Sequence, residues 1–515
     1  MLFFPNFTKI SLLTWIKNKI MATKKEEISI NDEYQQRLLK LKRLEELAAD
    51  PYPAKTDKNT IIEQFLADFA ILVKSEKKVV LAGRIRSLRL QGGSAFLHFE
   101  DESGKVQAFI RKDNIGAEGY QVFKENYDLG DFIEVTGTAF VTKTEEPTIL
   151  ASKIKILSKA LLPLPDKHSG LKDADLRFRK RYLDLLANPE VKKAFNLRSA
   201  VIKNIRNYFD KEGFIEVDTP ILQTVAGGAT AAPFTTHHNA LDIDLYLRVA
   251  PELYLKRLIV GGYEKVYEIA RCFRNEGIDH QHNPEFTQIE FYWAYKDYKF
   301  LMDFTEKFFK TLVKEVTGSL KVKNGDDILD FSGPYPRLDF KEALDKALKI
   351  DIDKASDKDL ADIAKKAKIA VDKSWGRGKL LDELYKKFVR AKLIQPTFII
   401  NHPLELSPLS KKLADRPNYV ERFQLVIKTA EVCNAFSELN DPLDQEERFK
   451  EQKRLCAAGD EEAQGADADF VEALKHGMPP TAGLGMGIDR LVMLLGDVEN
   501  IKEVILFPTM KPKDK

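Results

Sequence analysis

The sequence predicts an α+β protein in which a small N-terminal β-barrel precedes a larger domain of mixed helices and strands. Three observations support this class. Short strand patterns with glycine turns fill residues 78–157, a proline-rich stretch follows them, and helical and strand patterns alternate from residue 191 onward. The chain of 515 residues is long enough to form more than one hydrophobic core.

Five short strands form the predicted barrel. The turns between them contain Gly92-Gly93, Ser103-Gly104 and Gly130. The strands are expected at Val79–Leu90, Ala95–Glu100, Lys105–Arg111, Asp131–Thr142 and Thr148–Leu157. A five-stranded barrel of this size is typical of the OB-fold, which binds oligonucleotides, although other small β folds share the pattern.

Two segments, residues 1–20 and 21–77, precede the barrel. The segment 1–20 is apolar and basic, but Asn6 and Lys9 interrupt its apolar stretch, and it lacks the small-residue cleavage site of a secretion signal. We therefore expect an extension of unassigned role, with Met21 as the true start of the protein.

In the segment 21–77 we expect a helix over residues 31–50. Asn31 or Asp32 can cap its beginning, and Pro51 ends it. Its apolar stripe consists of Leu38, Leu41, Leu44 and Ala48. The other faces carry basic side chains, which we interpret as a solvated surface rather than an RNA contact. These side chains are Arg37, Lys40, Lys42 and Arg43.

The charge balance and the cysteines limit the functional classes. Lysine and arginine number 81 against 79 acidic residues, so binding to nucleic acid must come from local patches. Cys272, Cys433 and Cys456 form no C-x-x-C pair. This argues against a zinc site and a disulfide framework, and it favours the reducing cytoplasm. No stretch has the length and apolar character of a membrane span.

A linker is expected at residues 158–190, which contain the proline-rich segment LLPLPDKHSG. The larger domain, 191–515, includes a lysine- and aspartate-rich helical insertion at about 340–395. It begins with a helix at Val191–Glu212, which leads into the strand FIEVDTP. The side chains that this helix is expected to bury are Ile202, Ile205 and Phe209.

Residues 265–295 predict a strand, a loop and a returning strand. Side chains alternate between the two faces of a strand, so the returning strand has one polar and one apolar face. The polar face carries Phe286, Gln288, Glu290 and Tyr292, and the apolar face carries Ile289, Phe291 and Trp293. On the first strand, Cys272, Arg274 and Glu276 share a face if the strand runs that far. Ion pairs on a solvated face would not explain the aromatic rings on the polar side, whereas a nucleotide beside a second, charged substrate would.

Residues 481–495, TAGLGMGIDRLVMLL, place three alternating glycines before a helix. The spacing is not G-x-G-x-x-G, because Ile488 stands where the third glycine belongs. We interpret the segment as a strand that lets a ligand approach closely and leads into a helix begun by Asp489 and Arg490. An arginine at this position can reach phosphates, and its guanidinium can stack on a base.

Residues 422–442, RFQLVIKTAEVCNAFSELNDP, carry Glu431, Asn434 and Glu438. Acidic side chains here could hold magnesium or a cationic substrate. A surface hairpin that turns at Asn440-Asp441-Pro442 would explain the same residues.

Taken in order, these segments resemble the class II aminoacyl-tRNA synthetases. FIEVDTP, RCFRNEG with the NPEF loop, and GMGIDR resemble the three signature motifs of that class. The resemblance narrows to the lysyl-tRNA synthetases through APELYLKRL, FSELNDP and PPTAGLGMGIDR, and it extends from residue 78 to the end. It implies an antiparallel catalytic sheet flanked by helices, an OB-fold that binds the anticodon, and a homodimer. It also implies magnesium-dependent activation of L-lysine by ATP and transfer of the lysine to tRNA(Lys).

The resemblance implies roles for the nucleotide-binding residues. Arg274 would neutralise the α-phosphate and hold the lysine carboxylate. Phe286 and Arg490 would sandwich the adenine, while Glu276 and His282 would contact the nucleotide. Arg274, Glu276 and Arg490 are thus the expected catalytic residues.

The lysine-binding residues follow from the same resemblance. Gly228 and Glu252 would take the α-amino group, and Asn434 would help with the carboxylate. The residues that would receive the ε-ammonium group are Glu438 and Tyr292, with Glu290 nearby. An amino acid without the distal ammonium would leave Glu438 unpaired, which costs on the order of a few kcal/mol.

The resemblance also implies a metal site and an anticodon site. Glu431 would hold magnesium and share it with position 424, where the family usually has glutamate and this chain has Gln424. The glutamine keeps a carbonyl oxygen but loses the charge. In the barrel, Phe96 and Gln107 would stack on and hydrogen-bond the central anticodon uridine, with Arg84 nearby.

Two further departures lie near the segment GGATAAPF. Ala232 stands where arginine or lysine is usual, and Ala226 stands where proline is usual before the glycines. Gly228 is retained.

Three alternative functions differ from lysine charging in what they require. An aspartyl- or asparaginyl-tRNA synthetase needs a basic or amide-reading side-chain pocket, whereas the matched positions here are acidic and phenolic. A lysyl ligase that modifies an elongation factor typically lacks the anticodon barrel. A non-catalytic RNA-binding paralogue would be expected to lose charge in the ATP site, where Arg274, Glu431 and Arg490 remain and Gln424 is the exception.

Overall fold

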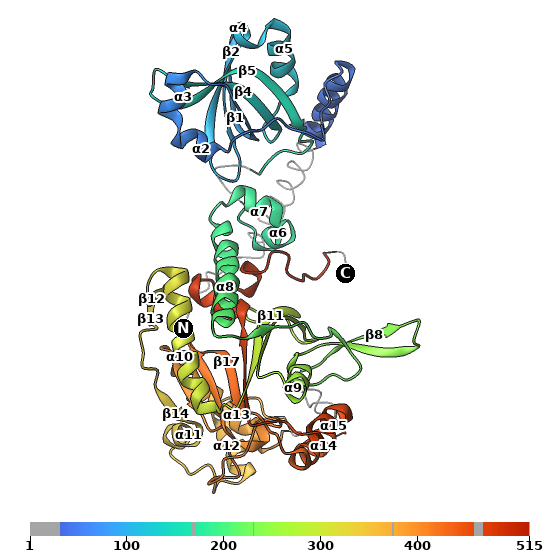
Figure 1. Cartoon of the computed structure of the whole chain (residues 1–515), viewed down its shortest axis with the longest axis vertical. Helices are drawn as coiled ribbons and strands as arrows, with labels where there is room; N and C mark the ends of the chain where they lie inside the picture. The colour runs from blue at the N-terminus through green and yellow to red at the C-terminus, as the bar shows by residue number, and fades with distance from the viewer. Residues whose placement is uncertain (1–30, 166–170, 230, 373–374, 458–466, 514–515) are drawn as a thin grey trace, which may run out of the picture. The chain divides into compact units, whose positions relative to one another are not determined.

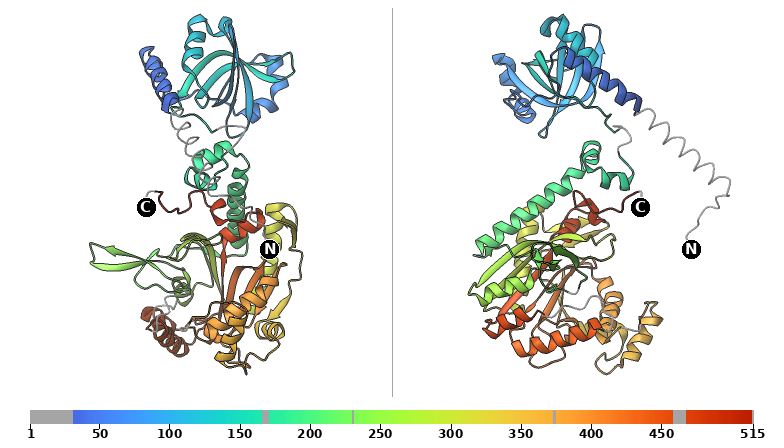
Figure 2. Two further views of the ribbon diagram at one scale, coloured as in Figure 1. Left: turned by 180° about the vertical axis from the view of Figure 1, so that it is seen from behind. Right: turned by 90° about the vertical axis from the view of Figure 1, so that its right-hand side faces the viewer.

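The structure is a computed structural model that describes residues 31–165, 171–229, 231–372, 375–457 and 467–513. The chain forms two compact units that divide after Gly170, within the predicted linker (Figures 1 and 2). The first is called the barrel unit and the second the sheet unit. The extension 1–20 and Met21 lie outside the described residues.

The barrel unit contains five strands that close in the order β1-β2-β3-β5-β4, which confirms the predicted barrel. The strands are β1 (Val79–Gln91), β2 (Ser94–Glu100), β3 (Lys105–Arg111), β4 (Phe132–Val141) and β5 (Pro147–Ser158). Alternate side chains fill its interior, so Ala95, Leu97 and Phe99 of β2 are all fully buried. Four short helices accompany it, namely α2 (Ile62–Ala67), α3 (Phe69–Ser75), α4 (Lys112–Ile115) and α5 (Ala117–Asn126).

The helix expected at 31–50 covers residues 31–46, and the prediction that its basic side chains are solvated is wrong for Arg37. Arg37 is buried, and its guanidinium donates hydrogen bonds to the carbonyl oxygens of Leu129 and Ala160 at 3.0 and 2.9 Å. Lys40 Nζ lies 2.5 Å from Asp128 Oδ1. Packing of the helix against the barrel brings these cations to backbone and carboxylate oxygens that sequence periodicity does not reveal.

The sheet unit is built on an eight-stranded sheet in the order β14-β15-β16-β17-β18-β11-β10-β6. The inner neighbours pair antiparallel, as expected, and the outermost pairs, β14–β15 and β10–β6, are parallel. The strands are β6 (Ile215–Glu216), β10 (Lys265–Phe273), β11 (Glu285–Ala294), β14 (Arg337–Asp339), β15 (Thr397–Ile400), β16 (Arg422–Ile427), β17 (Ala430–Ser437) and β18 (Thr481–Gly487).

One face of this sheet packs against helices. They are α8 (Val191–Lys211), α10 (Tyr298–Thr317) and α16 (Ile488–Leu495). The ring of Phe291 on β11 lies 4.9 Å from that of Phe209 and 5.6 Å from that of Phe304, and such aromatic contacts contribute strongly to a core. Ile205 and Phe209 are buried as predicted, and Ile202 is partly buried. The polar residues of β11 therefore lie on the opposite face.

The remaining elements surround the sheet. The insertion at about 340–395 forms α11 (Phe340–Leu348), α12 (Asp357–Lys366) and α13 (Arg377–Phe388), which share a separate hydrophobic core. The last part of the predicted linker is helical, with α6 (Ala174–Arg179) and α7 (Arg181–Ala187). The other elements are β7 (Leu222–Gln223), β8 (Phe234–His238), β9 (Ile243–Leu247), α9 (Glu252–Val260), β12 (Lys321–Asn324), β13 (Asp327–Asp330), α14 (Pro442–Ala457) and α15 (Ala468–Lys475).

The hairpin of β8 and β9 projects away from the body of the sheet unit (Figures 1 and 2). Among the described residues, none of the helices has both the length and the apolar character needed to cross a membrane.

Candidate functional site

The glycine-rich strand β18 forms the middle of the polar face of the sheet. Gly483 and Gly485 lie opposite Tyr292 and Glu290 of β11, and on the other side they lie opposite Phe436 and Asn434 of β17. Residues opposite each other in a ladder share a face. The glycines therefore leave backbone without side chains between two rows of functional groups.

Gly483 has no room for a side chain. A Cβ at this position would overlap Glu438 Oε1 and the ring of Tyr292. The prediction that the glycine segment is a strand that leads into a helix is confirmed, because α16 begins at Ile488 directly after β18. Close approach of a ligand to this strand stays a prediction.

Three buried carboxylates gather around this strand. Glu252 is the first residue of α9, Glu290 lies on β11, and Glu438 directly follows β17. Tyr292 donates a hydrogen bond to Glu290 Oε2 at 3.3 Å, and Gln288 donates one to Glu290 Oε1 at 2.7 Å. Among the described residues, no donor reaches Glu438 Oε1.

Burial disfavours the ionised form of all three carboxyl groups. Desolvation, with the negative charge of Glu252 beside it, raises the pKa of Glu290 to about 8. Desolvation also raises the pKa of Glu438 and of Glu252, even though a cation stands between them. Further positive charge beside these carboxyl groups would therefore stabilise their ionised forms.

That cation is Lys256, a residue that the sequence did not mark. It lies one turn after Glu252 on α9 and is fully buried. Its Nζ lies 2.5 Å from Glu252 Oε1 and is in ion contact with Glu438 Oε2. Rings of Phe436, Tyr292 and Phe470 lie 5.4 to 5.9 Å from the Nζ. The four-residue spacing between Glu252 and Lys256 in APELYLKRL was the available signal.

Gly228 lies beside Glu252, as expected for a shared binding position. Its φ of +90° favours glycine, and a Cβ here would approach the Cβ atoms of Glu252 and Ala250 to 3.1 and 3.3 Å. Of the two unusual alanines nearby, Ala232 accepts a hydrogen bond from Asn275 N at 2.8 Å through its carbonyl oxygen. This contact needs no particular side chain at position 232.

The first strand ends before two of the residues predicted to share its face. β10 stops at Phe273, so Arg274 and Glu276 lie in the loop that follows. The guanidinium of Arg274 lies 5.0 Å from the ring centre of Phe286, and its Nε is buried with no hydrogen-bond partner among the described residues. Glu276 is exposed. The alternation predicted for β11 is confirmed by the buried apolar face and the register with β18.

Arg490 links the loop that follows β10 to strand β17. It donates to the carbonyl oxygen of Glu431 at 3.1 Å, and its Nη2 lies 3.0 Å from His282 Nε2. Burial lowers the pKa of Arg490. Its neighbour Asp489 is buried, accepts a hydrogen bond from Thr287 N at 2.7 Å and pairs with Arg198, so it holds α16 to β11. The structure thus places Arg274, His282, Phe286 and Arg490 around one region of the polar face.

A β-bulge brings Glu431 to the same face as Gln424. The register shifts between Leu425 and Val426, and Val432 is the extra residue of β17. Gln424 Nε2 donates to Glu431 Oε2 at 2.8 Å, whereas Gln424 Oε1 is buried and forms no hydrogen bond of good geometry in the described part of the chain, although the ring of the buried His402 lies near this side chain. One carboxylate and one free amide oxygen therefore stand together.

Asn434 lies opposite Gln424 and accepts a hydrogen bond from Nε of the half-buried Arg422 at 2.8 Å. The sequence prediction did not include Arg422. Within the described ranges no group of three or more histidine, cysteine, aspartate or glutamate side chains could hold a metal ion by itself. A magnesium ion that keeps several waters and is shared with phosphates needs only one or two protein oxygens.

The barrel unit carries three half-buried aromatic rings close to one another, on β2, β3 and β4. Phe96 on β2 stacks on Phe109 of β3, with ring centres 4.3 Å apart, and Phe109 lies 6.0 Å from Phe140 of β4. Flat aromatic rings on a barrel surface can stack against unpaired bases.

Polar groups adjoin these rings. Gln107 donates to Glu146 Oε2 at 2.8 Å and accepts from Thr148 at 2.9 Å, and His98 Nε2 lies 2.7 Å from Glu146 Oε1. His98 and Glu146 were not among the predicted residues. Their places became apparent only through the register of β2, β3 and β5.

Arg84 does not lie beside Phe96, contrary to the expectation. It is opposite Glu100, four residues along β2 from Phe96, or about 13 Å of strand. Its guanidinium lies over the ring of Phe132 and donates to the carbonyl oxygen of Gly130 at 3.0 Å. Arg89 is the residue opposite Phe96.

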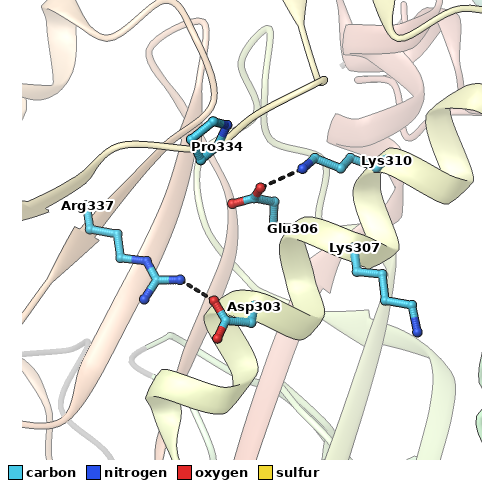
Figure 3. Close-up of a pocket in the computed structure, with 6 residues that line it drawn as sticks. All are labelled: Asp303, Glu306, Lys307, Lys310, Pro334 and Arg337. Carbon is cyan, nitrogen blue, oxygen red and sulfur yellow. Dashed lines mark hydrogen bonds and ion pairs between the residues drawn. The ribbon is translucent and has the colours of Figure 1, made fainter.

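A separate surface cavity of about 400 Å³ lies beside α10 (Figure 3). Its charged side chains all take part in ion pairs. Arg337 contacts Asp303, and Lys310 Nζ lies 2.7 Å from Glu306 Oε1 (Figure 3). Lys307 pairs with Glu212 at 3.2 Å. The cavity contains none of the predicted site residues.

Comparison with known proteins agrees with this geometry. Residues 173–511 match the family described as tRNA synthetases class II (D, K and N), and residues 79–157 match the OB-fold nucleic acid binding domain. The chain belongs to these class II tRNA synthetases.

Its relatives in this class include proteins named lysine–tRNA ligase. The one from Roseiflexus sp. (strain RS-1) is 47% identical over 95% of this chain and 100% of its own length. The one from Syntrophomonas wolfei is 46% identical over 95% of this chain and 98% of its own length. The one from Wolinella succinogenes is 48% identical over 93% of this chain and 96% of its own length. The family within the class is therefore that of the lysine–tRNA ligases.

Proposed function

We propose that the protein activates L-lysine with ATP and transfers the lysine to tRNA(Lys). The single observation that carries this proposal is the cluster of three buried carboxylates beside the glycine strand. These carboxylates require a positively charged ligand. This requirement distinguishes lysine from the other substrates of the D, K and N group, whose side chains are acidic or neutral.

Activation joins the carboxylate of lysine to the α-phosphate of ATP and releases diphosphate. The attacking carboxylate is already nucleophilic, so the enzyme needs no nucleophile of its own, and catalysis comes from positioning and charge stabilisation. Arg274 has a buried Nε without a partner in the described part of the chain, lies over the ring of Phe286, and its charge acts on Glu290 of the carboxylate pocket. We assign it to the α-phosphate and the lysine carboxylate, and we assign Phe286 and Arg490 to the adenine. Glu276 and His282 lie in the same loop and can contact the nucleotide.

The α-amino group is assigned to Glu252 and the backbone at Gly228, and Asn434 is assigned to the carboxylate. The ε-ammonium group is assigned to Glu438, with Tyr292 and Glu290 beside it. Glu438 Oε1 has no protein donor among the described residues, which leaves it free for this group. A neutral side chain would leave Glu438 Oε1 buried without a partner, at a cost of about 1–3 kcal/mol.

Class II synthetases use ATP and typically Mg²⁺, and the residues here fit such an ion. The unpartnered Gln424 Oε1 and the carboxylate of Glu431 supply two adjacent oxygens, which suit a hard cation. An ion bound there with ATP would neutralise phosphate charge. With one formal negative charge at this pair, we expect weaker metal binding than a pair of glutamates would give.

We assign the surface of Phe96 and Gln107, together with Glu146, to the tRNA anticodon. Stacking of Phe96 on Phe109 prepares a flat platform, and Gln107 supplies hydrogen-bonding groups at its edge. The position of Arg84 does not support a direct contact with a base stacked on Phe96.

A homodimer is part of the proposal. Ile215 lies on the edge strand β6, Leu222 begins the next strand, β7, and Ile221 directly precedes it. These large apolar residues have exposed fractions of 51%, 47% and 44%. Apolar side chains gathered at a surface favour an interface. We also place the protein in the cytoplasm, where the buried thiols of Cys272 and Cys433 remain free.

Lysine-dependent exchange of diphosphate into ATP tests the central claim. With Mg²⁺ present, we expect exchange with lysine but not with aspartate or asparagine. Glu438→Gln should raise the KM for lysine about tenfold to a hundredfold with little change in the KM for ATP. Glu134→Gln is a matched control, because Glu134 is a buried carboxylate of the barrel unit that accepts hydrogen bonds from Thr56 and Asp57. Exchange with another amino acid but not with lysine would refute the specificity, and no exchange at all would indicate a non-catalytic paralogue.

A further inference from the structure

Lys256 is a buried residue of the carboxylate pocket for which the reaction as described has no use. Its ammonium group is enclosed by Glu252, Glu438 and three aromatic rings, and its side chain has no exposed surface. Burying a lysine is costly unless the charge is paired. Burial lowers the pKa of Lys256, but Glu252 and Glu438 outweigh that effect and raise it, so the group stays charged.

We propose that Lys256 is a positioning residue that keeps the lysine pocket in the charge state the substrate requires. This rests on the proposed assignment of the pocket to lysine. Glu252, Glu290 and Glu438 carry three negative charges when ionised, and Lys256 compensates one of them. The two that remain equal the two ammonium groups of free lysine.

The geometry separates the two sides of Glu438. Oε2 is held by Lys256, whereas Oε1 points to the space above Gly483 that a Cβ would fill. Lys256 therefore fixes the carboxylate from behind and leaves one oxygen for the ε-ammonium group. The same ammonium holds Glu252 through Oε1. One buried side chain thus orients the acids assigned to both ends of the substrate.

Other charged and titratable groups face this cluster from the neighbouring strands and from the loop after β10. Glu290 and Tyr292 approach from β11, and Arg422 approaches from β16. Glu268 of β10 is neutralised by Arg248 at 2.5 Å, and Arg274 faces Glu290 from the loop after β10. None of these cations contacts Glu438, so the loss of Lys256 would leave that carboxylate without a counterion among the described residues.

The test compares Lys256→Met with Lys256→Arg and with a control. In K256M we expect the lysine KM in the exchange reaction to rise about tenfold or more, with the ATP KM nearly unchanged. We also expect the pH midpoint of lysine binding to rise by about one unit, because an opposite charge beside a carboxyl group shifts its pKa by at least that much. K256R keeps the charge and should recover part of both effects. A purely structural role would not move the pH midpoint.

Lys159→Met is the matched control. Lys159 is also fully buried and paired with two acids, Asp128 at 2.6 Å and Asp131 at 2.8 Å, but it belongs to the barrel unit. Lys159→Met should lower the thermal stability of the protein and leave the lysine KM and the pH midpoint of lysine binding unchanged. If K256M does not fold, K256Q is measured in the same way, because its amide can donate to a carboxylate but carries no charge.

The outcomes separate this inference from the proposed function. Wild-type protein without lysine-dependent exchange would refute the function. Wild-type exchange together with an unchanged lysine KM and midpoint in K256M or K256Q would overturn the role of Lys256 alone. A lower lysine KM in K256M would also overturn it, because that result would show that Lys256 competes with the substrate for the carboxylates.

Discussion

Binding of lysine should be coupled to the release of a proton from the pocket. Desolvation and the charge of Glu252 raise the pKa of Glu290 to about 8 in the empty protein. At neutral pH most molecules therefore carry a proton on Glu290. An arriving ammonium group needs the ionised carboxylate, so the proton must leave when lysine binds.

The size of the effect follows from this pKa. If Glu290 is protonated below about pH 8 in the absence of lysine and ionised in the complex, the Kd for lysine rises nearly tenfold for each unit by which the pH drops below that value. Between about pH 6 and pH 8 the total change is about 50-fold. The ε-ammonium group of lysine, with a pKa of about 10.4, stays charged over this range.

Titration calorimetry measures both consequences without ATP. The Kd should fall as the pH rises, and the heat of binding should depend on the ionisation enthalpy of the buffer because a proton is released. The raised pKa of Glu290 also makes the stability of the lysine-free protein depend on pH. A carboxyl group whose folded pKa is raised loses its stabilising contribution as the pH rises from about 4.5 to about 8, so the empty protein weakens over that window. The gain in Tm on adding lysine should therefore grow with pH. A constant Kd from pH 6 to 8, with no buffer-dependent heat, would refute the assignment of the protonated carboxyl group to the lysine pocket.

Three further predictions concern other parts of the site. Gly483→Ala should raise the lysine KM, because the new Cβ overlaps Glu438 Oε1 and the ring of Tyr292, and such overpacking costs about 1–3 kcal/mol. Gly119→Ala is the control, because a Cβ there meets open space. An unchanged lysine KM in Gly483→Ala would contradict the position of the pocket. Phe96→Ala should reduce charging of tRNA about tenfold to a hundredfold, since base stacking contributes about 1–3 kcal/mol, and it should leave diphosphate exchange unchanged. Equal losses in both assays would remove the anticodon role. Gln424→Glu adds a second carboxylate beside Glu431 and should tighten binding of Mn²⁺, used as a spectroscopic substitute for Mg²⁺, in the presence of ATP. No change in Mn²⁺ affinity would place the metal elsewhere.

Much of the fold could be predicted because its periodicities are local. The alternation of β2 and the apolar stripe of α8 are visible in the sequence and reappear as buried side chains. The start of β3 at Lys105 and its end at Arg111 agree with the prediction to the residue. The burial of Arg37 could not be predicted, since the carbonyl oxygens to which it donates lie about a hundred residues away.

The proximity of Gln424 and Glu431, the two residues assigned to the metal, could not be predicted from the local sequence. Alternation along β17 would put Glu431 and Asn434 on opposite faces, because they are three residues apart. The bulge at Val432 adds a residue and brings both to the face of Gln424. A bulge arises from pairing with the neighbouring strand, so it has no period in the sequence of its own strand. The departure at Gln424 could be read from the sequence, but its consequence, a buried amide oxygen without a partner beside a single carboxylate, depends on that one inserted residue.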